Sequence, residues 1–150
     1  VDHEKKKKYG ICEKLCVPAE ASFKLTVPPG AIPAASADAA AAYAAVPRKA
    51  PNLRPGDPSD FSVERRPQAT GAALILKARF PGAVEAAAMF LDAGDGRYLP
   101  LPRRTSTDGE TVTFEAAIES AEDLAQVKGA TVVAVLKGAG GQSEHTFVID

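Results

Sequence analysis

The feature that most constrains the fold is a series of short β-rich segments between residues 57 and 150. They cover residues 61–66, 72–80, 84–91, 98–105, 111–118, 131–137 and 144–149. Turn signals separate them, most clearly DAGDG at 92–96, TSTDGE at 105–110 and KGAGGQ at 137–142. About seven short strands in about 90 residues indicate an all-β protein with an immunoglobulin-like β-sandwich.

Alternating apolar residues predict which side chains fill the core of this sandwich. SAEDLAQVKG, at 120–129, breaks the strand pattern and predicts a short helical turn at a crossover. The expected core consists of Leu74, Leu76, Met89, Leu91, Val112, Phe114, Ala116, Val133 and Val135.

The first 56 residues have a different character. Phe23, Leu25 and Val27 alternate with polar residues, which predicts a strand from Ser22 to Val27. Ser36 is a plausible N-cap for an alanine-rich helix at 39–45, which Pro47 ends and which we expect either to pack closely or to act as a spacer. PNLRPGDPSD then predicts a linker or an ordered crossing.

These segments predict three regions: a cysteine-bearing segment at 1–30, a helix and linker at 31–56, and the sandwich at 57–150. One good strand in about 30 residues cannot bury a core. We therefore expect residues 1–30 to join a larger β-structure, either the following sandwich or a preceding β-domain.

Charge and hydropathy exclude some partners. The formal net charge is −1, which gives no general reason to expect nucleic acid or an anionic membrane. The Lys5–Lys8 run is a local exception; we expect a solvated arm, with a docking patch as the alternative. Arg65, Arg66, Arg103 and Arg104 are expected as edge-strand charges rather than as a binding patch. No apolar run reaches the roughly 20 residues of a membrane span, so we expect a soluble molecule without direct membrane insertion.

Both cysteines, Cys12 and Cys16, lie in ICEKLC. In one extended strand they would be roughly 13 Å apart, beyond the roughly 7 Å limit between Cα atoms for a disulfide. A bond between them therefore requires a bend or helical turn. Closing so short a loop stabilises a fold by only about 2 kcal/mol, which favours redox exchange over a purely structural disulfide but leaves both open. Lys14 would favour the thiolate and Glu13 would oppose it.

Metal binding is the third possibility. A tetrahedral zinc site needs four ligands, and only His3 and His145, at opposite ends of the chain, could supplement two cysteines. We expect both histidines to be exposed polar residues. Two thiolates alone could hold Cu(I). The sequence has no GxSxG elbow, P-loop or HExxH motif, and DAGDG lacks the ligand spacing of an EF-hand, so we expect a hairpin turn there.

The string YGICEKLCVPAEASFKLTVP, at 9–28, resembles the cysteine-bearing segment in the N-terminal periplasmic domain of DsbD-type thiol:disulfide interchange proteins, most closely their branch for suppression of copper sensitivity. The shared features are an aromatic before the first cysteine, the close pair, Val-Pro-Ala-Glu after the second cysteine, and an alternating strand closed by proline. The resemblance implies a periplasmic, immunoglobulin-like protein-disulfide reductase domain without an organic cofactor. It would carry electrons from a membrane-embedded reductase domain to periplasmic thioredoxin-like proteins.

The resemblance also implies roles for individual residues. Cys16 would form the mixed disulfide with a partner and Cys12 would resolve it, while Tyr9, Glu13 and Lys14 would tune the site, with Glu20 a weaker candidate. The better-known family members space their cysteines more widely and have a β-domain upstream. We therefore expect this chain to be part of a longer protein. The alternatives are a Cu(I)-binding module in copper tolerance and an interaction domain with a purely structural disulfide.

Overall fold

The computed structural model describes residues 2–12, 16–30, 36–94 and 96–150. The chain divides into two compact units, Val1–Ala40 and Ala41–Asp150, and each is described by itself below. The divide falls within α1 (Ala37–Ala44), in the region expected to link the two β-rich parts.

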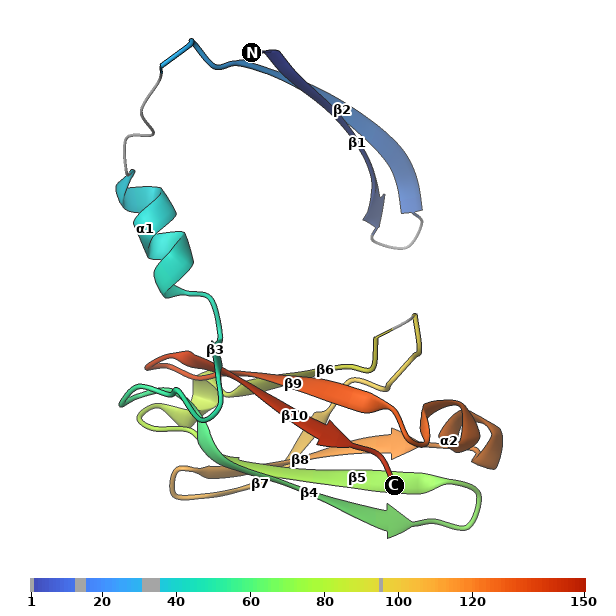
Figure 1. The fold of residues 1–150 in the computed structure, drawn as a ribbon. Helices are drawn as coiled ribbons and strands as arrows, with labels where there is room; N and C mark the ends of the chain where they lie inside the picture. Colours follow the sequence, from blue (N-terminus) through green and yellow to red (C-terminus); the bar gives the residue numbers. More distant parts are fainter. Residues whose placement is uncertain (1, 13–15, 31–35, 95) are drawn as a thin grey trace. The chain divides into compact units, whose positions relative to one another are not determined.

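The second unit is a sandwich of two four-stranded sheets (Figure 1). One sheet has the order β4-β5-β8-β7 and the other β3-β10-β9-β6. Apart from the two-residue β3, this is the arrangement of a constant-type immunoglobulin domain, four strands facing three. The strands are β3 (Arg48–Lys49), β4 (Ser59–Pro67), β5 (Ala72–Arg79), β6 (Ala88–Asp92), β7 (Arg103–Asp108), β8 (Thr111–Ile118), β9 (Thr131–Lys137) and β10 (Gln142–Val148). The expected all-β, immunoglobulin-like sandwich is therefore confirmed.

The core lies between the two sheets. Of the expected core residues, six are buried: Leu74, Leu76, Met89, Val112, Phe114 and Ala116. Leu91 is partly buried against the same cluster.

The prediction for β9 was wrong. Val132, Ala134 and Leu136 face the core, whereas Val133 and Val135 lie on the outer face and are only partly covered. The segment TVVAVLK is apolar at nearly every position, so alternation does not reveal which set faces inward.

Two predicted strands are shorter than expected. Residues 84–86 form the 3-10 helix η1 (Val84–Ala86), so β6 starts only at Ala88. Pro100 and Pro102 lack an N–H for ladder hydrogen bonds, and β7 starts after them at Arg103. In the described part of DAGDG the Gly94 N–H donates to Asp92 Oδ1 over 2.8 Å, and the Gly94 carbonyl accepts the Arg97 N–H over 3.0 Å. Asp95 lies outside the described residues. The expectation of a hairpin there was wrong, because the chain crosses from β6 to β7 in the other sheet.

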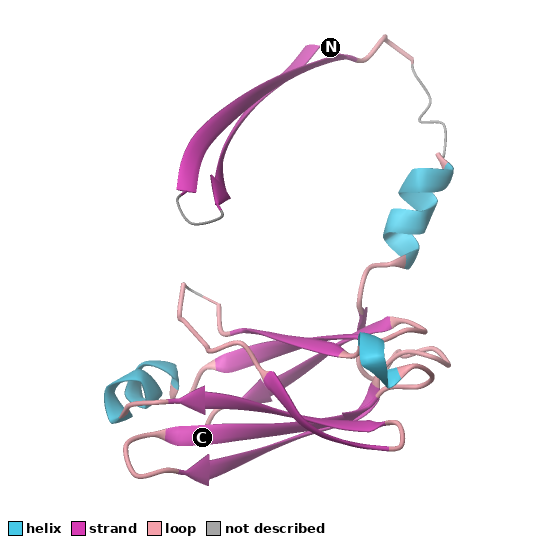
Figure 2. Cartoon of the chain, turned by 180° about the vertical axis from the view of Figure 1, so that it is seen from behind, coloured by secondary structure: helices cyan, strands magenta, loops and turns pink. Residues whose placement is uncertain are grey.

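The other turn predictions are confirmed. β7 and β8 are joined at Gly109, which has a φ of 57°, and β9 and β10 are joined through the KGAGGQ turn. α2 (Ala121–Val127) is the expected helical turn; the Asp123 N–H donates to Ser120 Oγ over 3.0 Å and caps it. Figure 2 shows this helix at one end of the sandwich.

The segment PNLRPGDPSD is an ordered crossing held by a buried carboxylate. The side chain of Asp57 is 2% exposed, accepts the Arg54 N–H over 2.8 Å, and pairs with Arg48 Nη1 over 3.3 Å. A Cβ added to Gly141 would lie 2.1 Å from Asp57 Oδ1. Glycine at this position therefore lets the β9–β10 turn close over the ion pair.

The four expected edge arginines do lie on β4 and β7, the outer strands of one sheet. Arg66 pairs with Glu64 over 2.9 Å on the exposed surface. Arg104 adds positive charge to the edge strand and also forms hydrogen bonds. Its Nη2 donates to the Ala87 carbonyl over 2.8 Å and to the Glu85 carbonyl over 3.3 Å. This side chain ties β7 to the segment that leads into the facing sheet.

The first unit contains a long hairpin of β1 (Asp2–Cys12) and β2 (Cys16–Thr26). β2 includes most of the predicted Ser22–Val27 strand, and the lysine run lies within β1. The expected N-cap of α1 is confirmed, since the Ala39 N–H donates to Ser36 Oγ over 3.0 Å. No residue of α1 is buried, and Tyr43 is 81% exposed.

Candidate redox site at the hairpin tip

The hairpin makes the two cysteines backbone partners. β1 ends at Cys12, β2 begins at Cys16, and the antiparallel register pairs these two residues directly. Opposed residues in such a ladder have Cα atoms about 4.5 or 5.5 Å apart, within the range of about 4.4–6.8 Å that a disulfide spans. The strands that end at Cys12 and begin at Cys16 run in opposite directions, so the two cysteines do not lie in one extended strand.

The structure describes the backbone of Cys12 and Cys16, but not their side chains. The register pairs even-numbered residues of β1 with even-numbered residues of β2, so these positions share one face of the hairpin and the odd-numbered positions share the other. Both cysteines belong to the even-numbered set. The next pair in this set is Gly10 with Pro18, followed by Lys8 with Glu20. Glycine has no side chain and proline a compact one, so the positions beside the cysteines carry little bulk. The sequence analysis did not single out Gly10 or Pro18, although counting back by two from each cysteine would have found them.

The charges nearest the cysteines in this set cancel. Lys8 Nζ lies 3.3 Å from Glu20 Oε1, and both side chains are mostly exposed. Glu20, a weak candidate for tuning the site, is thus engaged by a lysine. Farther along, Asp2 Oδ2 pairs with Lys24 over 3.1 Å, and a hydrogen bond from Thr26, with a second from Lys24, holds the pKa of Asp2 below its usual value. Two ion pairs across the strands, Lys8–Glu20 and Asp2–Lys24, therefore lie in the even-numbered set.

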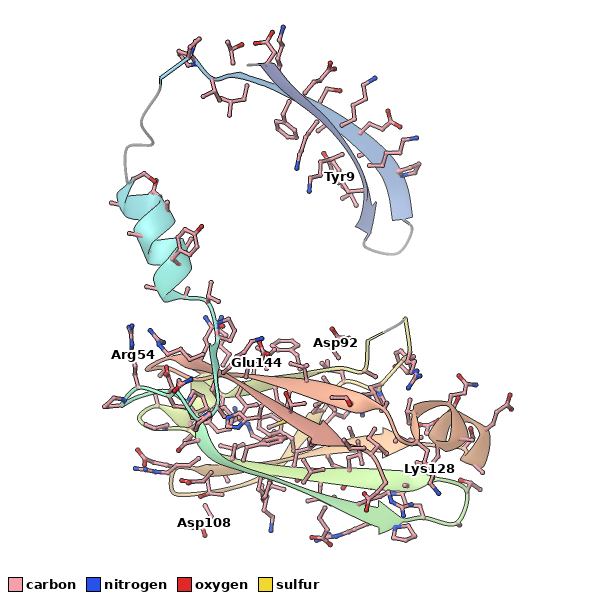
Figure 3. The ribbon with its side chains drawn as sticks, in the orientation of Figure 1. Tyr9, Arg54, Asp92, Asp108, Lys128 and Glu144 are labelled. Atoms are coloured by element: carbon pink, nitrogen blue, oxygen red, sulfur yellow. The ribbon has the colours of Figure 1, made fainter. Side chains whose placement is uncertain are left out.

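The other candidate tuning residues are not gathered around the cysteines. Tyr9 belongs to the odd-numbered set, opposite Ala19, and is 49% exposed. Figure 3 labels it on the hairpin. Glu13 and Lys14 lie outside the described residues. Only Tyr9 among the three is placed, and strand alternation puts it on the opposite side from the cysteine positions.

The odd-numbered set of the hairpin is largely apolar. Its exposed large side chains are Tyr9, Ile11, Val17, Phe23 and Leu25. Lys5 and Lys7 join them opposite Phe23 and Ala21. A two-stranded hairpin is at best marginally stable in water. This apolar face is what a packed sheet would bury.

Of the two histidines considered as metal ligands, His3 lies in β1 and His145 in β10. Among the side chains that the structure describes, within residues 2–12, 16–30, 36–94 and 96–150, no group of three or more His, Cys, Asp or Glu could hold a metal. His145, expected to be exposed, is partly buried in the sandwich: its Nε2 lies 3.1 Å from Ser143 Oγ, and its ring centroid is 5.0 Å from that of Phe61. The side chain of His3 is not described.

Within the described parts of the chain, none of the helices has the length and apolar character to span a bilayer. No family model, curated protein or solved structure matches the chain.

Proposed function

We propose that the hairpin is the redox-active part of a periplasmic thiol:disulfide exchange protein, and that Cys12 and Cys16 are its reacting pair. The observation that carries the proposal is their direct pairing in the β1–β2 register. Two thiols held opposite each other at a hairpin end meet at high effective concentration, as rapid resolution of a mixed disulfide requires. The small neighbouring residues Gly10 and Pro18 leave room for a partner's sulfur.

The reaction needs no organic cofactor. The Cys16 thiolate attacks a disulfide of a thioredoxin-like partner, a Cys16–partner bond forms, and the first partner thiolate leaves. The Cys12 thiolate then attacks Cys16 Sγ and releases the second partner thiolate. The partner gains two electrons and, with protons from solution, becomes a dithiol, while Cys12–Cys16 becomes a disulfide. A membrane-embedded reductase domain would return the pair to the dithiol form.

The proposal includes a larger domain around residues 1–30. The apolar odd-numbered face of the hairpin, including Phe23 and Leu25, is suited to pack against further strands of an immunoglobulin-like redox domain. Such a domain would keep the even-numbered positions, and with them the cysteines, on the opposite side, available to partners. Residues 31–56 would then link this domain to the sandwich at 57–150.

Trapping experiments test the assigned roles. The two single variants, Cys12→Ser and Cys16→Ser, are incubated with a thioredoxin-like protein that carries an activated disulfide at its nucleophilic cysteine. The Cys12→Ser variant should accumulate a mixed disulfide through Cys16, seen on a non-reducing gel and by mass, and Cys16→Ser should form little. Equal trapping by both variants would contradict the assignment of Cys16 as the attacking residue.

A binding titration distinguishes the Cu(I)-binding alternative from the redox proposal. A copper module should take one Cu(I) per chain in competition with a chelator, and either Cys→Ser change should abolish binding. Tight stoichiometric binding without exchange activity would replace the redox proposal with the copper one. A purely structural disulfide would give neither copper binding nor exchange.

A further inference from the structure

The outer face of the β10-β9-β6 sheet carries a small apolar patch. By register, Phe90 in β6 lies opposite Val135 in β9, and Val133 and Ala88 are the next residues on the same face. Phe90 is 51% exposed, and the other three are partly exposed. We call these four residues the β6–β9 patch. Because about half of the Phe90 side chain is exposed, the ring lacks part of the stabilisation that full burial would give.

Charges of opposite sign lie at the two ends of the β6–β9 patch. Lys137 is paired in register with Ala88 at one end, and Asp92 is paired with Val133 at the other. Neither Lys137 nor Asp92 forms an ion pair with any described residue. At the side of the patch, Glu144 is already engaged by Lys49 over 3.7 Å. Figure 3 shows Asp92 and Glu144 on this side of the sandwich and Asp108 on the other side.

This arrangement is complementary to itself. Consider two copies of the sheet that meet face to face about a two-fold axis lying between them, perpendicular to the strands and close to Phe90 and Val135. The strands of the two copies then run in opposite directions. Lys137 of one copy then faces Asp92 of the other, twice, around the paired Phe90 rings. Sheets that pack face to face lie about 10 Å apart, a gap that a lysine and an aspartate side chain can bridge. A partner lacking this spacing of charges would leave both unmatched.

We infer that the β6–β9 patch is the contact surface for a second copy of this chain, in a two-fold dimer held by Phe90 and by reciprocal Lys137–Asp92 pairs. Three strands about 4.8 Å apart and five residues long give roughly 250 Å² of sheet per copy. This is well below the roughly 800 Å² per partner of a stable interface. The dimer is therefore weak and forms with rising concentration or when the chains are brought together. The inference does not depend on the proposed redox function.

The test is sedimentation equilibrium of the full chain in a Cys12→Ser/Cys16→Ser background, which excludes intermolecular disulfides. We expect a reversible monomer–dimer equilibrium below about 1 mM. Lys137→Asp should raise the dissociation constant about tenfold, because two attractive pairs become repulsive. Adding Asp92→Lys to that variant should restore the dissociation constant to within about threefold, since the pairs are re-formed with reversed signs. Phe90→Ser should weaken the dimer at least as much as Lys137→Asp.

Two controls keep the inference falsifiable. Lys77→Asp makes the same charge change on β5, whose exposed lysine lies on the other sheet, and should leave the dimer unchanged. Phe23→Ser/Leu25→Ser alters only the apolar face of the hairpin and should also leave it unchanged. A strictly monomeric chain at about 1 mM, a dimer insensitive to Lys137→Asp, or one lost in the hairpin variant would each overturn the inference. The last of these would place self-association in the first unit.

Discussion

The buried ion pair between Asp57 and Arg48 allows a stability change to be worked out from the structure. Asp57→Ala removes a carboxylate that is 2% exposed, a hydrogen bond from the Arg54 N–H, and the partner of an Arg48 side chain that is only 21% exposed. Breaking a buried pair by removing one partner costs about 3–5 kcal/mol. Because Arg48 retains some solvent contact, we expect a value near the low end, about 3 kcal/mol.

Asp57→Asn distinguishes the contribution of the Asp57 charge to stability from that of its hydrogen bond with the Arg54 N–H. An asparagine oxygen can still accept the Arg54 N–H, so this change should cost only about 1–2 kcal/mol. Glu122→Ala, at an exposed position of α2, serves as the control and should cost about 0.5 kcal/mol or less.

The assay is urea unfolding followed by a signal from the sandwich, with a common m-value checked before the midpoints are compared. For a domain of this size, about 3 kcal/mol corresponds to a fall in melting temperature of at least about 12 °C. An Asp57→Ala variant within about 0.5 kcal/mol of the parent chain would refute the argument that this carboxylate holds the crossing segment to the β9–β10 turn.

Two further predictions concern the sandwich. Burial lowers the pKa of His145, against a smaller opposing effect of a hydrogen bond with the Pro58 backbone, so the folded state favours the neutral ring; stability should therefore fall as the pH drops below the ordinary value of about 6.5. His145→Gln should remove that part of the pH dependence in urea unfolding between pH 7.5 and 5.5, whereas an unchanged profile would contradict it. Leu136→Ala, at a fully buried position, should cost about 2–5 kcal/mol, and Val135→Ala beside it should cost less than about 1 kcal/mol. Equal costs in the same unfolding assay would contradict the orientation of β9.

The positions of most strands in the sandwich follow from features visible in the sequence, and the errors in the predictions have local causes. Glycine-containing turns and alternating residues place β4, β5, β8 and β10 close to their observed positions. β9 is apolar on both faces, so the pattern at Val132 and Val133 could not distinguish inside from outside. The crossing after Asp92 depends on which sheet the next strand joins, and that is a long-range choice that a turn motif does not encode.

The candidate site was partly predictable. The spacing in ICEKLC shows that a bond between its cysteines needs a bend or helical turn, but not that Cys12 lies opposite Cys16 in a hairpin. The register of β1 with β2 depends on pairs far from the cysteines, such as Lys5 with Phe23. Asp57 was overlooked because a single aspartate in a proline-rich stretch gives no sign of burial. Its role appears only when the distant Gly141 turn is placed over it.

Cys12 and Cys16 are proposed to exchange electrons with partner proteins. The most direct measurement is the equilibrium reduction potential of this pair, obtained by titration with reduced and oxidised glutathione, alkylation of the free thiols, and mass analysis. A potential between about −120 and −270 mV, the span of known exchange proteins, is the expected result. A value well below about −300 mV would identify a structural disulfide and contradict the proposed function.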